Sequence, residues 1–225
     1  MQIGSVTEAT DVLRAMHPDV LVVQGTDAGG HGRAQGASLI TLLPEVIDTV
    51  QTITSQERIP YPIMIAAGGI AESRSAAAAF VLGASGVVMG TRFLASPEAN
   101  ISKGYQNAVL STVDGGQTTV RTKVYDDLRG TTGWAETYNA RGIINKSYTD
   151  SVAGLHLNEN KKLYEEEEGK GDAGWGVTGR MTTYAGAGVG LVREVTRASE
   201  IVEDVRRGAK ALLEGFGSAA VTGKL

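Results

Sequence analysis

Short apolar segments recur through the first 95 residues and alternate with amphipathic ones. Val20–Val23, Ile63–Ala67 and Gly86–Met89 are runs of mainly aliphatic residues without polar alternation. Such runs are typical of strands that are buried on both faces of a parallel sheet. A shorter extended segment, Met1–Val6, precedes them. The pattern therefore predicts four strands of one parallel sheet.

Helices are predicted between these strands, because apolar residues recur there at helical spacing. The predicted helices are Thr7–Met16, Leu39–Thr52 and Glu72–Leu82. Thr7 is the expected N-cap of the first helix, Pro44 is expected near the first turn of the second, and Gly83 is a typical C′ residue for the third. Four strand–helix repeats at a spacing of roughly 20–40 residues predict an α/β fold with a parallel sheet.

The remainder of the chain is less regular. Helices are predicted at Pro97–Val113 and Arg193–Phe216, and the second has a strong apolar stripe. The alternation in Thr118–Val124 predicts a strand or an extended arm. No linker divides the chain, so we expect a single domain, 1–225, in which residues 96–225 extend the βα part, 1–95.

Composition excludes several classes of function. The net charge is −4 without a basic stripe, which argues against nucleic acid or an anionic membrane as partner. The chain has no cysteine, which excludes disulfides and Cys-ligated metal, and we predict no metal site. No apolar run approaches the length of a membrane span. We expect a cytoplasmic protein, although Gly223-Lys224-Leu225 partly matches a peroxisomal Ser-Lys-Leu tail.

Glycines follow two of the predicted strands. Gly68-Gly69 ends one strand before a helix, and Gly90 with Thr91 ends the next. Backbone N–H groups at such junctions bind anions, since glycine permits close approach and the helix dipole favours negative charge. Two neighbouring turns of this kind predict a phosphate site, while either one alone could be an ordinary tight turn.

One of the three histidines lies in a third glycine-rich turn. Gly25–Gly32 follows the strand at Val20–Val23 and contains His31. A neutral imidazole at a mobile strand end can take a proton from carbon, whereas an isolated loop histidine is more often surface decoration. Asp27 could orient His31 or cap the next segment, and the sequence leaves both open. We assign structural roles to His17 and His156.

Three motifs together resemble the nitronate monooxygenase family, formerly called 2-nitropropane dioxygenase. They are Gln24-Gly25-Thr26-Asp27-Ala28-Gly29-Gly30-His31, Ala66-Ala67-Gly68-Gly69-Ile70 and Met89-Gly90-Thr91-Arg92-Phe93. The similarity continues weakly through Tyr184-Ala185-Gly186-Ala187-Gly188. The family usually has Glu at the position of Asp27 and often Trp at that of Tyr184.

The resemblance implies a (βα)8 barrel of the TIM type that is incomplete in this chain. The family's barrel begins well before Met1, which falls in what resembles the fifth strand. About four parallel βα units, residues 1–95, would form the C-terminal half of an FMN barrel. We therefore expect a truncated product or fragment. Its open edge at Met1–Val6 could support a homo-oligomer or another association.

By resemblance, the cofactor is FMN and the partners are a nitronate or nitroalkane and O2. His31 would be the base that removes the proton α to the nitro group, and the products would be a carbonyl compound and nitrite. Gln24, Gly29 and Gly30 would contact the flavin. The phosphate would be held by Gly68, Gly69 and the turn formed by Val88, Met89, Gly90 and Thr91.

Two alternatives stay open from the sequence. The first is an FMN-dependent NAD(P)H:quinone or enoyl-thioester reductase on the same type of barrel, because these enzymes resemble the family around the Gly-Gly-His segment. The second is a half-barrel that lacks flavin and has no catalytic activity. Reduction of the flavin by NADH would indicate the reductase. A protein that stays colourless after incubation with FMN would indicate the flavin-free half-barrel.

Overall fold

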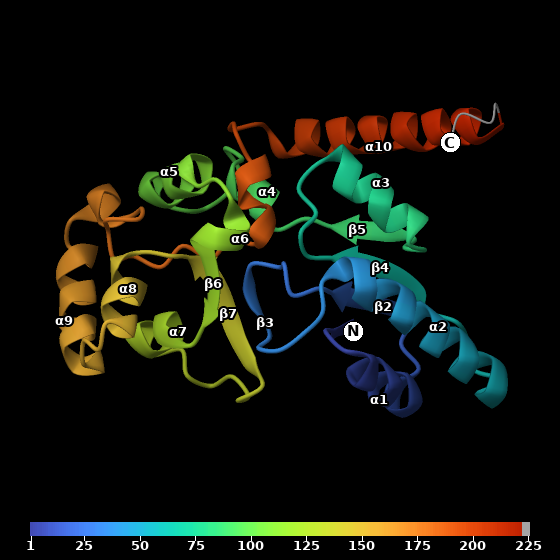
Figure 1. Cartoon of the computed structure of the whole chain (residues 1–225), viewed down its shortest axis with the longest axis horizontal. Coiled ribbons are helices and arrows are strands. Elements are labelled where there is room, and N and C mark those ends of the chain that lie inside the picture. The colour runs from blue at the N-terminus through green and yellow to red at the C-terminus, as the bar shows by residue number, and fades with distance from the viewer. Residues whose placement is uncertain (222–225) are drawn as a thin grey trace.

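The apolar runs form one parallel sheet, as predicted (Figure 1). A computed structural model describes residues 1–221, without the side chains of residues 217–221. The strands, in the order β1-β2-β4-β5, are β1 (Gln2–Ile3), β2 (Val20–Gln24), β4 (Ile63–Ala67) and β5 (Gly86–Val88). All three pairings are parallel. Within the described residues, this sheet does not close into a barrel.

The helices that follow these strands include the three predicted ones, with different ends, and a fourth, short helix that was not predicted. They are α1 (Val6–Met16), α2 (Leu39–Glu57), α3 (Ser73–Val81) and the short α4 (Thr91–Leu94). The N-cap predicted at Thr7 is wrong, because the Ser5 hydroxyl accepts the N–H of Glu8 at 3.1 Å. Pro44 lies beyond the first turn, inside α2. Gly83 has φ +104°, as a residue after a helix C-cap often has.

The main hydrophobic core lies on one face of the sheet, between the sheet and its helices. Leu21, Val23 and Met64 point into this core and are almost completely buried. The opposite face carries Val20 and Ile63, which are paired in register and are 37% and 53% exposed. The strands thus have the composition of doubly buried strands, but only one face is covered within residues 1–221.

A second sheet joins the two parts of the chain, and most of it was not predicted. It contains β3 (Gly30–Arg33), β7 (Tyr138–Ile143) and β6 (Thr119–Thr122), all antiparallel, in the order β3-β7-β6. The prediction that Gly30 to Gly32 belong to a mobile turn is wrong, because β3 pairs with β7 from Gly30↔Arg141 to Arg33↔Tyr138. Of the two alternatives left open for Thr118–Val124, a strand or an extended arm, the structure has the strand, β6.

The remaining helices surround the second sheet and extend along the first. They are α5 (Lys103–Ser111), α6 (Gly115–Thr118), α7 (Val124–Arg129), α8 (Lys146–Val152), α9 (Leu157–Glu168), η1 (Gly171–Gly174), η2 (Ala187–Leu191) and α10 (Ala198–Val221). The helix predicted from Pro97 begins only at Lys103, because the Ser102 hydroxyl caps it. The helix predicted from Arg193 begins at Ala198, whose N–H is bound by the Glu98 carboxylate.

The last helix returns to the first part of the molecule. Figure 1 shows α10 lying along α3, and Ile201, Val205 and Ala209 are buried in the main core. The C-terminal helix therefore does not pack independently of residues 1–95, and the single domain stays a prediction. The limits of 1–95 and 96–225 themselves stay predictions.

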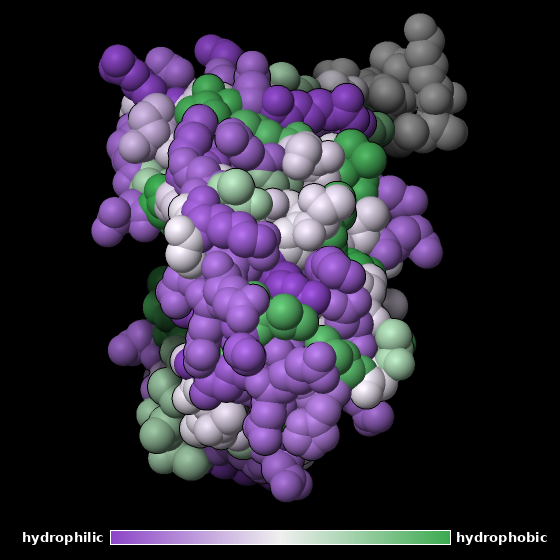
Figure 2. All heavy atoms as spheres, turned by 90° about the vertical axis from the view of Figure 1, so that its left-hand side faces the viewer, coloured by the Kyte–Doolittle hydropathy of each residue, from purple (hydrophilic) through white to green (hydrophobic). Residues whose placement is uncertain are grey.

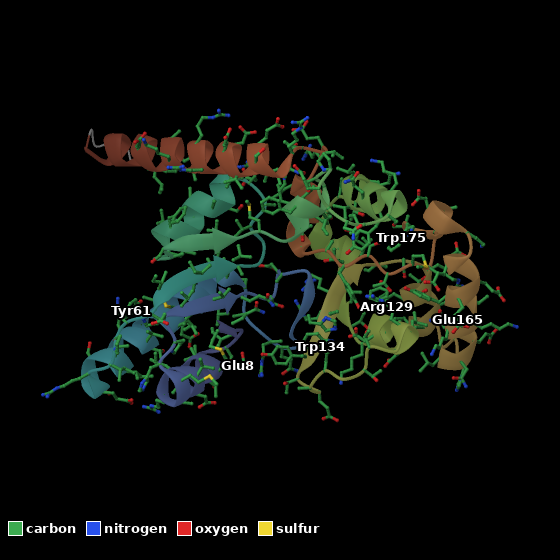
Figure 3. The ribbon with its side chains drawn as sticks, turned by 180° about the vertical axis from the view of Figure 1, so that it is seen from behind. Glu8, Tyr61, Arg129, Trp134, Glu165 and Trp175 are labelled. Carbon is green, nitrogen blue, oxygen red and sulfur yellow. The ribbon has the colours of Figure 1, made fainter. Side chains whose placement is uncertain are left out.

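At the other end of the molecule, α9 presents charged residues to solvent. Figure 2 faces this end and shows a mostly hydrophilic surface, and Figure 3 shows Glu165 pointing outward from α9. Glu165 and Glu166 are exposed, while Tyr164 is buried against the neighbouring elements. Glu165 and Glu166 thus lie on the solvated face of this helix.

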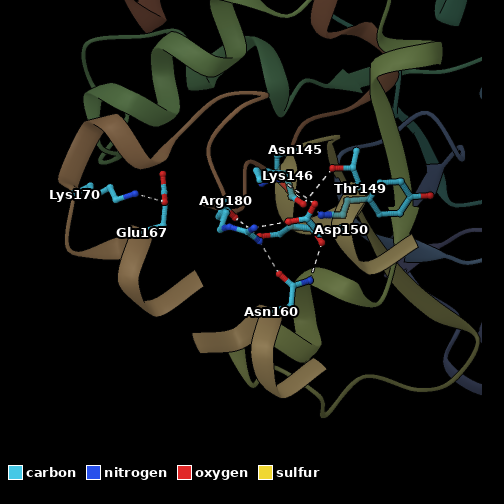
Figure 4. A network of polar contacts seen from close by, with 10 residues as sticks. Asn145, Lys146, Thr149, Asp150, Asn160, Glu167, Lys170 and Arg180 are labelled. Atoms are coloured by element: carbon cyan, nitrogen blue, oxygen red, sulfur yellow. Dashed lines mark hydrogen bonds and ion pairs between the residues drawn. The ribbon is translucent and has the colours of Figure 1, made fainter. Parts of the chain in front are cut away.

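Behind α9, one buried arginine connects three segments (Figure 4). Arg180 pairs with Asp150 of α8 and donates to the side-chain oxygen of Asn160 of α9 at 3.1 Å. Asn160 in turn donates to the carbonyl of Ser147 at 2.8 Å. The Arg180 side chain is only 8% exposed, so its charge depends on these partners.

We expect Arg180→Met to destabilise the protein by about 1–3 kcal/mol, because it removes a buried donor from Asn160 and from Asp150, which keeps Lys146 as partner. Chemical denaturation measures this, with Arg207→Met as control, since the pair Arg207–Asp204 is exposed and should contribute little. Hydrogen bonds from Lys146 and Arg180 lower the pKa of Asp150. The Asp150 carboxylate therefore contributes fully to the free energy of unfolding at pH values above its pKa in the unfolded chain. This contribution is lost as the pH falls through its lowered pKa in the folded protein. An equal loss of stability in Arg180→Met and Arg207→Met would contradict the structural role assigned to Arg180.

Candidate functional site

A cavity of about 300 Å³ lies at the carboxyl ends of β2, β4 and β5. Its lining includes Gln24, Gly29, Gly30, Gly68, Gly69, Val88, Gly90 and Thr91. These are all the predicted cofactor-binding residues except Met89. Met89 instead lines an apolar groove between α3, β5 and α10. The glycine-rich strand ends therefore converge, and their binding of a cofactor stays a prediction.

The floor of the cavity needs glycine for its backbone conformation. Gly68 and Gly69 have φ values of +96° and +74°, in the left-handed region that favours glycine. Gly90 has φ −99°, and a Cβ built there would meet no atom within 4 Å. The N–H groups of Gly69 and Gly90 donate to no protein acceptor among the described residues. Two unpaired donors on neighbouring strand ends are a suitable site for an anion.

A segment from near the end of the chain closes the other side of the cavity. Gly186 packs so closely on Gly29 that a Cβ on Gly29 would lie 2.5 Å from the Gly186 nitrogen. The Gly186 N–H donates to Thr91 Oγ1 at 2.9 Å, which leaves the hydroxyl proton of Thr91 able to donate to a ligand. Tyr184 and Gly188 also line the cavity. The weak motif at Tyr184–Gly188 thus contributes to the site.

Two arginines that the sequence analysis missed hold the turn before β3. Arg121 donates to the carbonyls of Ala28 at 2.8 Å and Gly30 at 3.2 Å, and Arg141 donates to that of Thr26 at 3.1 Å. Burial, and then the like charge of Arg141, lower the pKa of Arg121 to about 10. Arg121 therefore remains protonated at neutral pH and keeps this turn in place.

His31 is paired with a carboxylate from α7, Asp126. Its Nε2 lies 2.9 Å and 3.0 Å from the two carboxylate oxygens of Asp126, whose side chain is 6% exposed. Asp126 also accepts from Thr131 Oγ1 at 2.9 Å and from the Tyr184 hydroxyl at 3.1 Å. The group that orients His31 is therefore Asp126. The carboxyl group of Asp27 lies beside Gly69 instead.

This pairing determines which ring nitrogen can accept a proton. An ionised carboxylate only accepts hydrogen bonds, so Nε2 of a neutral His31 must carry its proton and Nδ1 must be the acceptor. Within residues 1–221, no group hydrogen-bonds to Nδ1. His31 Nδ1 is thus a free base in the arrangement that Asp126 imposes.

His31 is not among the residues that line the cavity, and its connection to the cavity runs through two residues that are. Gly30, the residue before it, and Tyr184 both line the cavity, and the ring centroids of His31 and Tyr184 are 5.7 Å apart. Burial and the charge of Asp126 raise the pKa of Tyr184 to about 12, so its hydroxyl stays protonated and donates to Asp126. Tyr184 thereby connects the base to the cavity.

The two tryptophans occupy different places. Trp134 stacks on His31, and Figure 3 shows it where the two parts of the molecule meet. Trp175 packs on Tyr105, with ring centroids 5.0 Å apart. His156 caps α9, where its Nδ1 accepts the N–H of Asn158 at 3.3 Å, and His17 is the C-cap of α1. These two histidines therefore have the structural roles assigned to them.

Among residues 1–221, no three His, Cys, Asp or Glu side chains are grouped so that they could hold a metal ion. None of the helices in this part of the chain combines the length and the apolar character that a bilayer crossing requires.

Comparisons with known sequences identify close relatives. The profile of the family "Nitronate monooxygenase" matches residues 1–208. The chain is 50% identical over 215 residues to nitronate monooxygenase npaC of Metarhizium robertsii, covering 95% of this chain and 58% of that protein. It is 37% identical over 209 residues to nitronate monooxygenase of Neurospora crassa, covering 93% and 53%. The chain thus spans less than two thirds of these relatives.

Solved structures support the predicted type of fold. FabK from Thermotoga maritima superposes with a TM-score of 0.72 at 24% identity, covering 96% of this chain and 62% of that one. Nitroalkane oxidase from Streptomyces ansochromogenes superposes with a TM-score of 0.69 at 25% identity, covering 94% and 58%. These similarities confirm an α/β fold of the TIM-barrel type, of which the four parallel strands form part.

Proposed function

Because the chain belongs to the nitronate monooxygenase family, we propose that it provides the FMN-phosphate site and the proton-transfer group of a flavin-dependent oxidoreductase. The proposed reaction converts a nitroalkane or its nitronate, with O2, to a carbonyl compound and nitrite. The observation that carries the proposal is the convergence of glycine-rich strand ends on one cavity, to whose lining residue Tyr184 the His31–Asp126 pair is hydrogen-bonded.

The residues of the cavity fit FMN. Open space at Gly90, the unpaired N–H groups of Gly69 and Gly90, and the hydroxyl of Thr91 suit a phosphate group. The apolar part of the lining includes Ala67 and Leu94, which suit an aromatic ring system. FMN, when bound, would supply the electron acceptor that no amino-acid side chain here can be.

The proton step falls to His31. Its Nδ1 would take the proton from the carbon next to the nitro group. The C–H bonding electrons would stay on the substrate as the nitronate. The imidazolium that forms is stabilised by Asp126, which keeps three hydrogen-bond donors around its carboxylate. Burial of Asp126 strengthens this pairing, since nearby water is limited.

The test is a titration of the purified protein with FMN, followed by flavin absorbance and fluorescence. We expect binding, bleaching of the bound flavin by a nitronate under anaerobic conditions, and nitrite release once O2 is admitted. Rapid bleaching by NADH with no response to nitronate would indicate a reductase instead. Absence of any FMN binding would overturn the proposal and favour the flavin-free alternative.

Gly90→Ala tests the phosphate site directly. The added methyl group points into the open space of the cavity at a normal backbone conformation, so we expect unchanged stability and FMN affinity lowered by about tenfold or more. Gly215→Ala is the matched control, since its Cβ would also meet nothing, but on the exposed C-terminal helix. Equal FMN affinities in both variants would contradict a phosphate at Gly90.

A further inference from the structure

The ring of His31 is covered on one face by an indole. Trp134 and His31 have ring centroids 3.8 Å apart and an interplanar angle of 9°, which is a parallel stack. The His31 side chain is 16% exposed, whereas Trp134 is 51% exposed. Trp134 thus covers the imidazole with one face, and about half of its surface is open to solvent.

The loop that carries Trp134 is attached at both ends to the surroundings of His31. It runs from Gly130, after α7, to Thr137, before β7, and its residues are exposed. At the first end, the Thr131 N–H donates to the carbonyl of Asp126 at 3.0 Å. At the other end, the Thr137 carbonyl accepts the N–H of Ala34, directly after β3, at 2.8 Å. The loop therefore joins the carboxylate partner of His31 to the end of its own strand.

Two contacts together determine the orientation of the imidazole. The hydrogen bond to Asp126 defines the direction of Nε2, but it allows rotation of the ring about that bond. The stack on Trp134 removes this rotation by defining the plane of the ring. With both contacts, Nδ1 points in one direction.

The indole also affects the charge that forms on the ring. A cation over the face of Trp is attracted by the negative potential of the ring, and Trp is the strongest aromatic partner in this respect. The other groups around His31 are Asp126, the Tyr184 hydroxyl and Arg129, whose guanidinium lies 5.4 Å from the Tyr184 ring centroid. Arg129 disfavours an imidazolium, whereas Asp126 and Trp134 favour it.

We propose that Trp134 is a positioning residue for proton abstraction. It holds the plane of the His31 ring so that Nδ1 faces the substrate, and it stabilises the imidazolium that forms. The proposal rests on the proposed function of His31 as base. In this step the substrate C–H bond breaks, the proton binds Nδ1, and the electron pair remains on the nitronate. A substrate that is already a nitronate needs no such step.

The kinetic test compares these two substrates in FMN-loaded protein. We expect Trp134→Leu to lower kcat/KM for a neutral nitroalkane by about 10–100-fold and that for a preformed nitronate by less than about threefold. Trp134→Phe, which keeps an aromatic face, should recover most of the loss. Trp175→Phe is the control and should change neither value. Equal losses for both substrates, or none, would overturn the proposal.

A second test needs neither FMN nor turnover. In Trp175→Phe, Trp134 is the sole tryptophan, so the tryptophan emission reports on its surroundings alone. Because His31 covers one face of the indole, we expect His31→Ala in this background to increase the quenching of the emission by acrylamide. His156→Asn is the control and should leave the quenching unchanged. Equal quenching with and without the His31 ring would contradict the stack, whereas failure of FMN binding alone would contradict only the proposed function.

Discussion

Replacing His31 by glutamine is expected to lower kcat/KM for a neutral nitroalkane by about 10²–10⁴-fold, the usual contribution of a general base. Glutamine can still donate to Asp126, but it has no nitrogen that accepts a proton near neutral pH. Turnover of a preformed nitronate should fall by less than about tenfold, since no proton has to be removed. Nitrite release at equal FMN occupancy measures both values.

His156→Asn is the control for this variant. His156 only caps α9, and asparagine is a good N-cap, so neither activity nor stability should change. If His31→Gln processes the neutral nitroalkane at the original rate, His31 is not the base. If both substrates are lost together, the residue acts in binding and not in proton transfer.

The second large effect is expected for Asp126→Asn, which should lower kcat/KM for a neutral nitroalkane by about 10²–10³-fold. The amide is uncharged and cannot stabilise an imidazolium. It can also donate to Nε2, in which case Nδ1 would carry the ring proton and could not act as base. The three donors around Asp126 would lose a charged acceptor, so we also expect a loss of about 1–3 kcal/mol in stability.

Kinetics with both substrates and a denaturant titration of each variant measure these effects. Asp127→Asn is the matched control, because Asp127 is the next residue of α7 and makes no contact with His31. Wild-type kinetics in Asp126→Asn would show that the pairing with His31 has no role in the reaction. A loss in stability without a kinetic change would assign Asp126 to folding alone.

The extent to which the sequence predicted the site differs from one residue to another. The glycines at 68, 69 and 90 were identified because they follow directly on apolar strands, and parallel strands bring their carboxyl ends to one edge. His31 was identified because it lies within the third of these turns. Asp126 was not, since it is 95 residues away and nothing in its local pattern distinguishes it from a surface acid on a short helix.

Similar reasons explain why Arg121 and Trp134 were missed or left without a role. Arg121 lies in a segment predicted as a strand or an extended arm, but the carbonyls of Ala28 and Gly30 that it holds are 93 and 91 residues away. The sequence around Trp134 gives no sign of its partner, because a lone aromatic residue has no periodicity that indicates one. Its contact with His31 depends on the antiparallel pairing of β3 with β7.

The sequence by itself determined the parallel βα part, since hydrophobic burial and helix periodicity act over a few neighbouring residues and leave a pattern that can be recognised locally. Only the tertiary structure decided that Gly30–Arg33 is a strand, because two glycines in four residues have little intrinsic preference for extended structure. Hydrogen bonds to β7 supply what local preference lacks. By the same pairing, a carboxylate and an indole from distant parts of the chain come to lie against His31.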